Sequence, residues 1–234
     1  MGVIMNISLA FTTYNSAQFI ENQLDKGYIN ASNGLIDEIV IQDDFTQDYV
    51  DLQKYKSDEV KLFQNKKHLS PLLSRVNLVN NCKNDWVWIM DSDNFLNVEI
   101  FDVIKNIELK NNTIYHSSFA KPNFSFKDHS NQIIDMKYAV DNFDALSTKI
   151  LLNTGNYLAP KSEYLKVAEK IDNKYNYYTP EVLYYNYLWL SSGNLINVLD
   201  EYEYEHTVRF GYWHNSNNIE STINEMYTTH YDNI

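Results

Sequence analysis

Short apolar segments alternate with segments of helical spacing through the first half of the chain, and this alternation limits the fold more than any other feature. Strands that alternate with helices usually pair in parallel, and the helices then cover the sheet. We therefore expect an α/β fold with a mostly parallel central sheet. The expected strands are Ile4–Phe11, Ile36–Ile41, Glu59–Phe63 and Asp85–Met90, and the expected helices are Ala17–Leu24, Ser70–Cys82 and Val98–Ile107.

The second half is less regular. Residues 121–141 contain Pro, Asn and mixed polarity, and we expect them to form a loop region. Residues from 215 onward are polar and are expected to form a terminal helix or a tail. The remaining expected strands are 113–118, 156–159, 195–199 and 202–208, and the remaining helices are 162–171 and 180–190, the last with Thr179 as N-cap and Pro180 at the first helical position.

Charge and cysteine content exclude several classes of protein. The formal net charge is -12, so the chain lacks the basic footprint of a protein that binds nucleic acid or an anionic membrane. Cys82 is the only cysteine and cannot form an internal disulfide. No run approaches the ~20 apolar residues of a transmembrane segment, and the first residues do not resemble a signal peptide. We expect a cytoplasmic protein without a transmembrane segment.

Polar side chains follow three of the expected strands. Asn15 follows the first, Asp43 and Asp44 follow the second, and Asp91 and Asp93 follow the fourth. In parallel sheets, ligands bind beyond the carboxyl ends of the strands. These three clusters are therefore expected to converge on one edge of the sheet.

The sequence Asp91-Ser92-Asp93 suits a divalent cation, because paired carboxylates are ligands of Mn²⁺ or Mg²⁺. The alternative is a simple turn, since Asp and Ser are common in turns. The six glycines form no phosphate-binding loop, and Arg75 and Arg209 are the only arginines. A cation is then the simplest means of neutralising a bound diphosphate.

Four short motifs lie in order within residues 4–96. They are Ile7–Asn15, Glu38–Asp48, Ser74-Arg75-Val76-Asn77 and Asp91-Ser92-Asp93-Asn94. Their order and spacing resemble the inverting family 2 glycosyltransferases with the GT-A fold. One departure is Thr12, which stands where that family usually has proline.

The resemblance implies a single GT-A-like domain over residues 1–234, built as a three-layer sandwich. Residues 1–96 would bind the nucleotide, residues 97–214 would form the acceptor side, and residues 215–234 would be the helix or tail. The implied reaction moves a sugar from a nucleotide-sugar donor to a hydroxyl group of a glycan or other acceptor, with inversion and with Mn²⁺ or Mg²⁺. The implied donor-binding residues are Thr13, Tyr14, Asp43, Asp44, Arg75 and Ser92, and the implied metal ligands are Asp91 and Asp93.

The catalytic base is less defined, because the family commonly has an acid pair at the start of a late helix. Here Glu181 is followed by Val182, so Glu181 is the candidate base. Its alternative role is to stabilise the helix dipole. Asp141 and Asp144 are further candidates for the base.

Past that helix, Tyr204–Arg209 resembles the family segment whose histidine often completes the metal site. His206 is the candidate ligand and His214 the second choice, whereas Arg209 is a candidate partner of the diphosphate. Aromatic side chains between 175 and 189 surround the expected acceptor side, although core packing is the commoner role of such residues. Two other functions remain open: an inactive relative that binds nucleotide or glycan, and a nucleotidyltransferase.

Overall fold

A computed structural model describes residues 5–172, 181–207 and 217–228. One sheet contains strands from both halves of the chain, in the order β3-β2-β1-β4-β9-β6-β10-β5, with β7 on β6 and β8 on β10. The strands are β1 (Ile7–Thr13), β2 (Ile36–Asp43), β3 (Val60–Gln64), β4 (Trp86–Asp91), β5 (Phe95–Leu96), β6 (Thr113–Lys121), β7 (Phe124–Ser125), β8 (Ile133–Ile134), β9 (Tyr157–Pro160) and β10 (Leu195–Glu205).

The sheet is mixed, with parallel pairing in most of its long strands. β1 pairs in parallel with both β2 and β4, β2 pairs in parallel with β3, and β10 pairs in parallel with β6. β9 is antiparallel to both of its neighbours, β4 and β6. The predicted parallel sheet is therefore confirmed for the first four long strands, and β9 joins that group to the strands of the second half.

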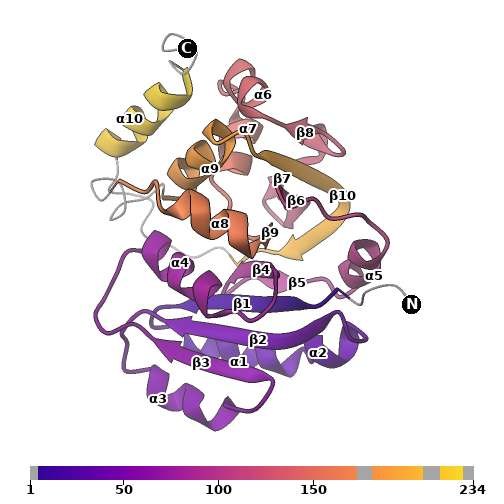
Figure 1. Cartoon of the computed structure of the whole chain (residues 1–234), viewed down its shortest axis with the longest axis vertical. Coiled ribbons are helices and arrows are strands. Elements are labelled where there is room, and N and C mark those ends of the chain that lie inside the picture. Colours follow the sequence, from indigo (N-terminus) through magenta and orange to yellow (C-terminus); the bar gives the residue numbers. More distant parts are fainter. Residues whose placement is uncertain (1–4, 173–180, 208–216, 229–234) are drawn as a thin grey trace.

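Helices cover both faces of the sheet, so the molecule has three layers. Figure 1 shows α4 in front of the sheet and α1 and α2 behind it; α8 and α9 contact α4 on the front face. The helices are α1 (Ala17–Asp25), α2 (Tyr28–Ala31), α3 (Tyr49–Leu52), α4 (Pro71–Asn81), α5 (Ile100–Lys105), α6 (Met136–Asp141), α7 (Leu146–Leu152), α8 (Lys161–Ala168), α9 (Glu181–Ser191) and α10 (Asn217–Thr228), with short 3-10 turns η1 (Gln53–Tyr55) and η2 (Lys127–His129).

Local sequence explains where α4 begins. The Ser70 side chain accepts a hydrogen bond from the Leu73 backbone N–H at 3.2 Å, which caps the helix. Pro71 occupies the first turn, where its missing N–H leaves no bond unmade. Leu72, Leu78 and Val79 then face the sheet, and this burial fixes the helix against β1 and β2. The positions of Ser74 and Arg75 in the same helix follow from this orientation.

Residues 121–141 differ from the expected loop region. They contain β7, η2, β8 and α6, of which β8 pairs with β10 through Ile134 and Ile196. The Asp135 side chain caps α6 by accepting from the Tyr138 backbone N–H at 2.7 Å. Two-residue strands have too little sequence for a period to be visible, so pairing with β10 decides their structure. The expectation of a loop was wrong for this reason.

The expected strands 195–199 and 202–208 form one strand, β10, which ends at Glu205; Val208 lies outside the described residues. Its pairing with β6 shifts register between Leu199 and Glu203, which explains the interrupted pattern in the sequence. The terminal segment contains a helix, α10, as one of the two expected alternatives. No helix among the described residues is long and apolar enough to cross a membrane.

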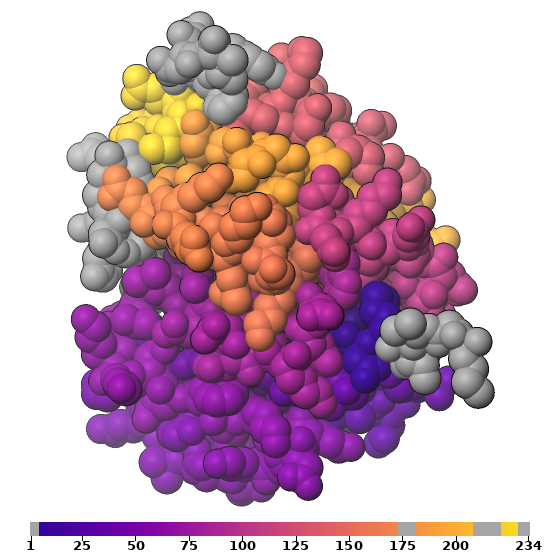
Figure 2. Space-filling model, viewed as in Figure 1, coloured from indigo at the N-terminus to yellow at the C-terminus, as the bar shows by residue number. Residues whose placement is uncertain are grey.

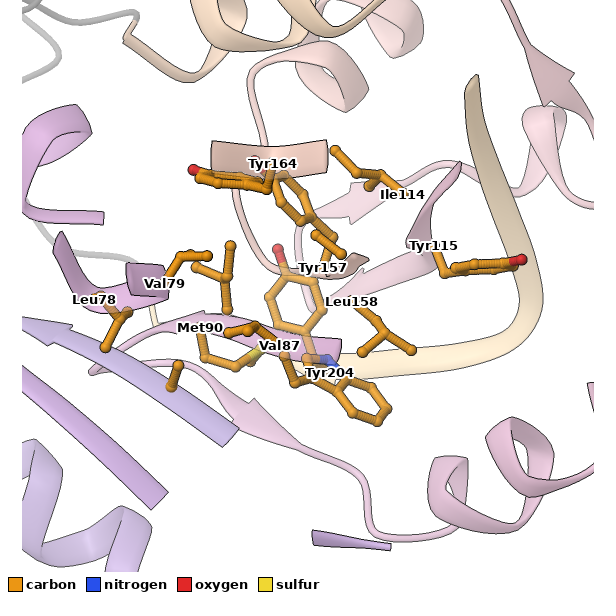
Figure 3. Packing of buried hydrophobic residues seen from close by; sticks show 14 of the residues in the cluster. Leu78, Val79, Val87, Met90, Ile114, Tyr115, Tyr157, Leu158, Tyr164 and Tyr204 are labelled. Carbon is orange, nitrogen blue, oxygen red and sulfur yellow. The ribbon is translucent and has the colours of Figure 1, made fainter. Parts of the chain in front are cut away.

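The core joins the two halves of the chain. The Trp88 indole N–H of β4 donates to the Tyr202 hydroxyl of β10 at 2.8 Å, and the two rings meet edge to face. Figure 3 shows Tyr157 and Leu158 of β9 packed among Val87, Met90 and Tyr204. In Figure 2 the first half, in indigo and purple, lies directly against the second half, in pink and orange. The assignment of one domain to residues 1–234 stays a prediction.

Candidate active site

The carboxyl ends of β1, β2 and β4 place the predicted clusters side by side. β1 is the central strand: Thr13 is paired with Asp43 of β2, and Thr12 is paired with Asp91 of β4. Asp43, Asp44 and Thr13 are buried, whereas Asp91 is half-buried. The three strand ends therefore form one edge, as their sequence positions predict.

Asp43 holds its own loop. Its carboxylate accepts hydrogen bonds from the Thr46 N–H at 2.8 Å, the Thr46 hydroxyl at 2.6 Å and the Gln64 amide at 3.0 Å. The loop residue Phe45 has a φ of 64° and is 55% exposed. Asp43 thus stabilises the loop that follows it, and this loop presents Phe45 to solvent.

Asp44 is held by groups of the segment that follows β3. One carboxylate oxygen accepts from the Asn65 amide at 2.8 Å and the Leu69 N–H at 2.9 Å, and the other lies 2.9 Å from His68 Nδ1. Asn65 was not singled out in the sequence. It also accepts from Gln42 and Asn77, so it connects Asp44 with α4.

Thr13 and Tyr14 differ in their exposure. The Thr13 hydroxyl is buried and has no hydrogen-bond partner among the described residues. The Tyr14 side chain is 41% exposed, and its ring centroid lies 4.7 Å from that of His68. An open aromatic face therefore lies at the end of β1, close to the carboxylate of Asp44.

Asp91 is bound by three side chains. Arg75 Nη2 donates to one carboxylate oxygen, and the Asn156 and Asn94 amides donate to the other at 3.2 and 3.4 Å. Asn156 also accepts from the Asp91 backbone N–H at 2.7 Å. Both oxygens of Asp91 are therefore engaged within the protein. The sequence predicts a strand that begins at Asn156, but it does not reveal the contact of Asn156 with Asp91.

The loop after Asp91 is anchored by α1. The Gln23 amide donates to the Ser92 carbonyl at 3.0 Å and to the Asn94 carbonyl at 2.5 Å. The Ser92 side chain is buried and Asp93 is half-buried. Because its backbone is fixed on both sides of Asp93, this loop is a rigid support for the Asp93 carboxyl group.

Arg75 and Glu181 add two buried charges beside Asp91. Arg75 is 6% exposed and Glu181 is 8% exposed. Burial raises the pKa of the Glu181 carboxyl, and the negative charge of Asp91 raises it further, while the charge of Arg75 lowers it in part. A carboxyl group with a raised pKa is typical of residues that exchange protons in catalysis.

His206 lies next to the loop that carries the paired acids. The Thr207 N–H donates to the Asn94 side chain at 3.1 Å, which fixes this segment to the loop. His206 Nδ1 is buried and has no hydrogen-bond partner among the described residues. Burial lowers the pKa of the imidazole and the charge of Asp91 raises it in part, so the neutral, metal-binding form is favoured.

The predicted metal site fits these residues in part. His206 Nδ1, which has no hydrogen-bond partner in the described part of the chain, can act as a metal ligand, and Asp93 supplies a carboxylate on the adjoining loop. Asp91 is already held by Arg75, Asn94 and Asn156. Among the described residues, no three His, Cys, Asp or Glu side chains come together as a ready metal site.

Other predicted residues lie away from this edge or outside the described part of the chain. Asp141 and Asp144 are exposed, and Asp141 forms an ion pair with Lys137. Outside the described residues lie Thr179, Pro180, Arg209, His214 and the tyrosines at 175, 177 and 178.

Comparisons with known proteins agree with this geometry. A model described as glycosyl transferase family 2 matches residues 8–167. The crystal structure of S. aureus TarS 1-349 in complex with UDP-GlcNAc has a TM-score of 0.61 and 20% identity, over 88% of this chain and 60% of that chain. The same fragment with UDP has a TM-score of 0.63 and 18% identity, over 87% and 61%. No curated protein matches the chain.

These findings confirm the GT-A-like α/β fold expected from the sequence. The chain spans about 60% of the length of the TarS 1-349 fragment, and 37% of the longer TarS structure, with a TM-score of 0.62 and 15% identity. The family match covers all four motifs from which the resemblance was inferred, apart from Ile7, the first residue of the first motif.

Proposed function

Because the chain belongs to glycosyl transferase family 2, we propose that it transfers a sugar from a nucleoside diphosphate donor to a hydroxyl group of an acceptor. The observation that carries this proposal is the single edge at which Thr13, Asp43 and Asp91 end neighbouring strands. Such an edge is where α/β sheets bind nucleotides. UDP-GlcNAc is the first donor to test, since a solved structure of similar fold is a complex with it.

The nucleoside would lie at the ends of β1 and β2. The exposed ring of Tyr14 offers a face for a nucleobase, and the unpartnered Thr13 hydroxyl offers a hydrogen bond. Asp44, held rigidly by Asn65 and Leu69, offers a carboxylate edge to base or ribose. Asp43 would support this site through its loop, and Ser92 would contribute to the diphosphate side.

The diphosphate would lie over the loop that carries Asp93. We assign Asp93 and His206 as the residues that hold a divalent cation, with Mn²⁺ suited to one carboxylate and one imidazole. Asp91 stays a predicted ligand, although its bonds to Arg75, Asn94 and Asn156 favour a supporting role. When bound, the cation stabilises the charge that grows on the leaving diphosphate.

Glu181 would remove the proton from the acceptor hydroxyl group. The reaction with inversion forms the new bond between that oxygen and the anomeric carbon as the bond to the diphosphate breaks. Burial supports this role, because a raised pKa brings a carboxyl group closer to the pH at which a base works best. Val182, which stands where the family commonly has the base, leaves Glu181 as the carboxyl group at this helix start.

The test is a panel of nucleotide sugars with and without Mn²⁺. Donor binding raises the melting temperature by mass action, and turnover releases a nucleoside diphosphate. An Asp93→Asn variant is the matched control, and it should lose the Mn²⁺-dependent part of both signals. Binding without turnover of any donor or acceptor would identify an inactive relative, and release of pyrophosphate would identify a nucleotidyltransferase. The cytoplasmic location stays a prediction from the sequence.

A further inference from the structure

The guanidinium group of Arg75 fills a closed slot between Asp91 and Gly155. A Cβ atom built on Gly155 would lie 1.6 Å from Arg75 Nη1 and 2.7 Å from Cζ. Real Cβ atoms do not approach other atoms so closely, so no residue except glycine fits while the guanidinium stays in place. The backbone of Gly155 is not in the left-handed region, and the need for glycine is therefore one of space.

The slot closes Arg75 off from solvent. Its side chain is 7% exposed, Nη2 is bonded to Asp91, and Nη1 faces Gly155. Nε and Nη1 have no hydrogen-bond partner among the described residues. A phosphate could reach this group only if Arg75 gave up its bond to Asp91 and left the slot.

Titratable groups from four elements surround the slot. Asp91 of β4 and Glu181 of α9 are the acids, and Tyr157 of β9 and Tyr164 of α8 are the titratable hydroxyl groups. Figure 3 shows Tyr157 and Tyr164 next to each other above Val87 and Met90. A buried guanidinium is stable only with such partners, and an acid left without it would be a buried unpaired charge.

We propose that Arg75 is a positioning residue, which Gly155 holds in place and which fixes the Asp91 carboxylate and balances the charge of Glu181 without touching the donor. The proposal rests on the function proposed above. It replaces the expectation that Arg75 contacts the donor. With its carboxylate held by Arg75, Asn94 and Asn156, Asp91 supports the loop that carries Asp93.

A double-mutant cycle in thermal unfolding tests the slot without any need for turnover. Gly155→Ala adds one carbon atom where Nη1 lies, whereas Arg75→Lys removes Cζ and both Nη atoms. We expect Gly155→Ala to lower the Tm by roughly 3–10 °C. The double variant should have a Tm no lower than Arg75→Lys alone, because the collision is then absent. Additive losses of Tm would overturn the proposal.

Affinity and turnover test whether Arg75 acts without touching the donor. For both single variants we expect kcat to fall about tenfold or more, while the Kd for UDP with Mn²⁺ stays within about twofold of the wild type. A Kd that rises about tenfold in Arg75→Lys, with kcat unchanged, would show a donor contact and refute the proposal. A wild type that turns over no donor would refute the proposed function instead, and the Tm cycle with the UDP affinity would then decide the role of Arg75.

Discussion

Glu181 is buried near the negative charge of Asp91 and the positive charge of Arg75. The effect of these neighbours on its protonation can be tested directly. Burial and Asp91 raise the pKa of its carboxyl group, and Arg75 opposes them. A base must be unprotonated, so kcat should fall on acidification at a higher pH than an ordinary glutamate would give. Glu181→Gln should lower kcat by roughly 10²–10⁴-fold and leave UDP affinity nearly unchanged. An unchanged kcat would assign the base to another residue.

The predicted acids were visible in the sequence, whereas their partners were not. Asp91 and Asp93 follow a strongly apolar strand, so their position at a strand end could be predicted. Asn156 contacts Asp91 only because β9 pairs antiparallel with β4, 65 residues further along the chain. No local pattern contains that pairing, and the enclosure of Arg75 by Gly155 depends on the same strand.

Among the elements, α4 has a start that its sequence specifies and that experiment can weaken selectively. Ser70→Ala removes the acceptor for the Leu73 N–H, and we expect a loss of about 1 kcal/mol in the free energy of unfolding. Urea denaturation measures this loss. Ser70→Asp is the control, because a carboxylate at the N-cap also accepts that bond and should keep most of the stability. Equal losses in both variants would contradict the capping role.

Helix α10 was expected only as a helix or a tail, because its polar sequence does not show what it packs against. In the structure Tyr227 is fully buried, its ring stacks on Phe143 at 4.6 Å, and its hydroxyl group donates to the Leu183 carbonyl at 3.0 Å. These contacts attach α10 to α9 and to the end of α6. The sequence of residues 121–141 likewise does not show their contacts. Pairing with β10 and the Asp135 cap give them a structure that their loop-like composition does not indicate.

The packing of Tyr227 in α10 predicts stability losses of different size for two variants. Tyr227→Ala should lower the free energy of unfolding by about 3–5 kcal/mol, because a large buried ring is lost. Tyr227→Phe keeps the ring and removes only the hydrogen bond, so its loss should be about 1 kcal/mol. Urea denaturation would measure both losses. Similar losses in the two variants would mean that the hydrogen bond, and not the ring, holds α10.

For the whole molecule, His116 links stability to pH. The side chain lies inside the second half of the sheet, 1% exposed, with its ring edge against Phe126 at 5.2 Å and Nδ1 2.8 Å from the Ser117 carbonyl. Nε2 has no hydrogen-bond partner among the described residues. Burial lowers the pKa of this imidazole to about 4, so the folded protein binds its proton less readily than the unfolded chain, where the pKa is about 6.5.

Stability should therefore fall as the pH falls from about 6.5 to about 4, by about 3 kcal/mol for this group alone. Glu181, with its raised pKa, acts in the opposite direction, so measurements on the wild type alone cannot isolate the contribution of His116. The comparison with His116→Gln does, because the variant lacks the titrating ring and keeps the other groups. Urea denaturation at pH 7.5 and pH 4 should show a loss on acidification that is about 3 kcal/mol smaller in His116→Gln. Equal losses in the two proteins would show that the pKa of His116 is the same in the folded and unfolded states.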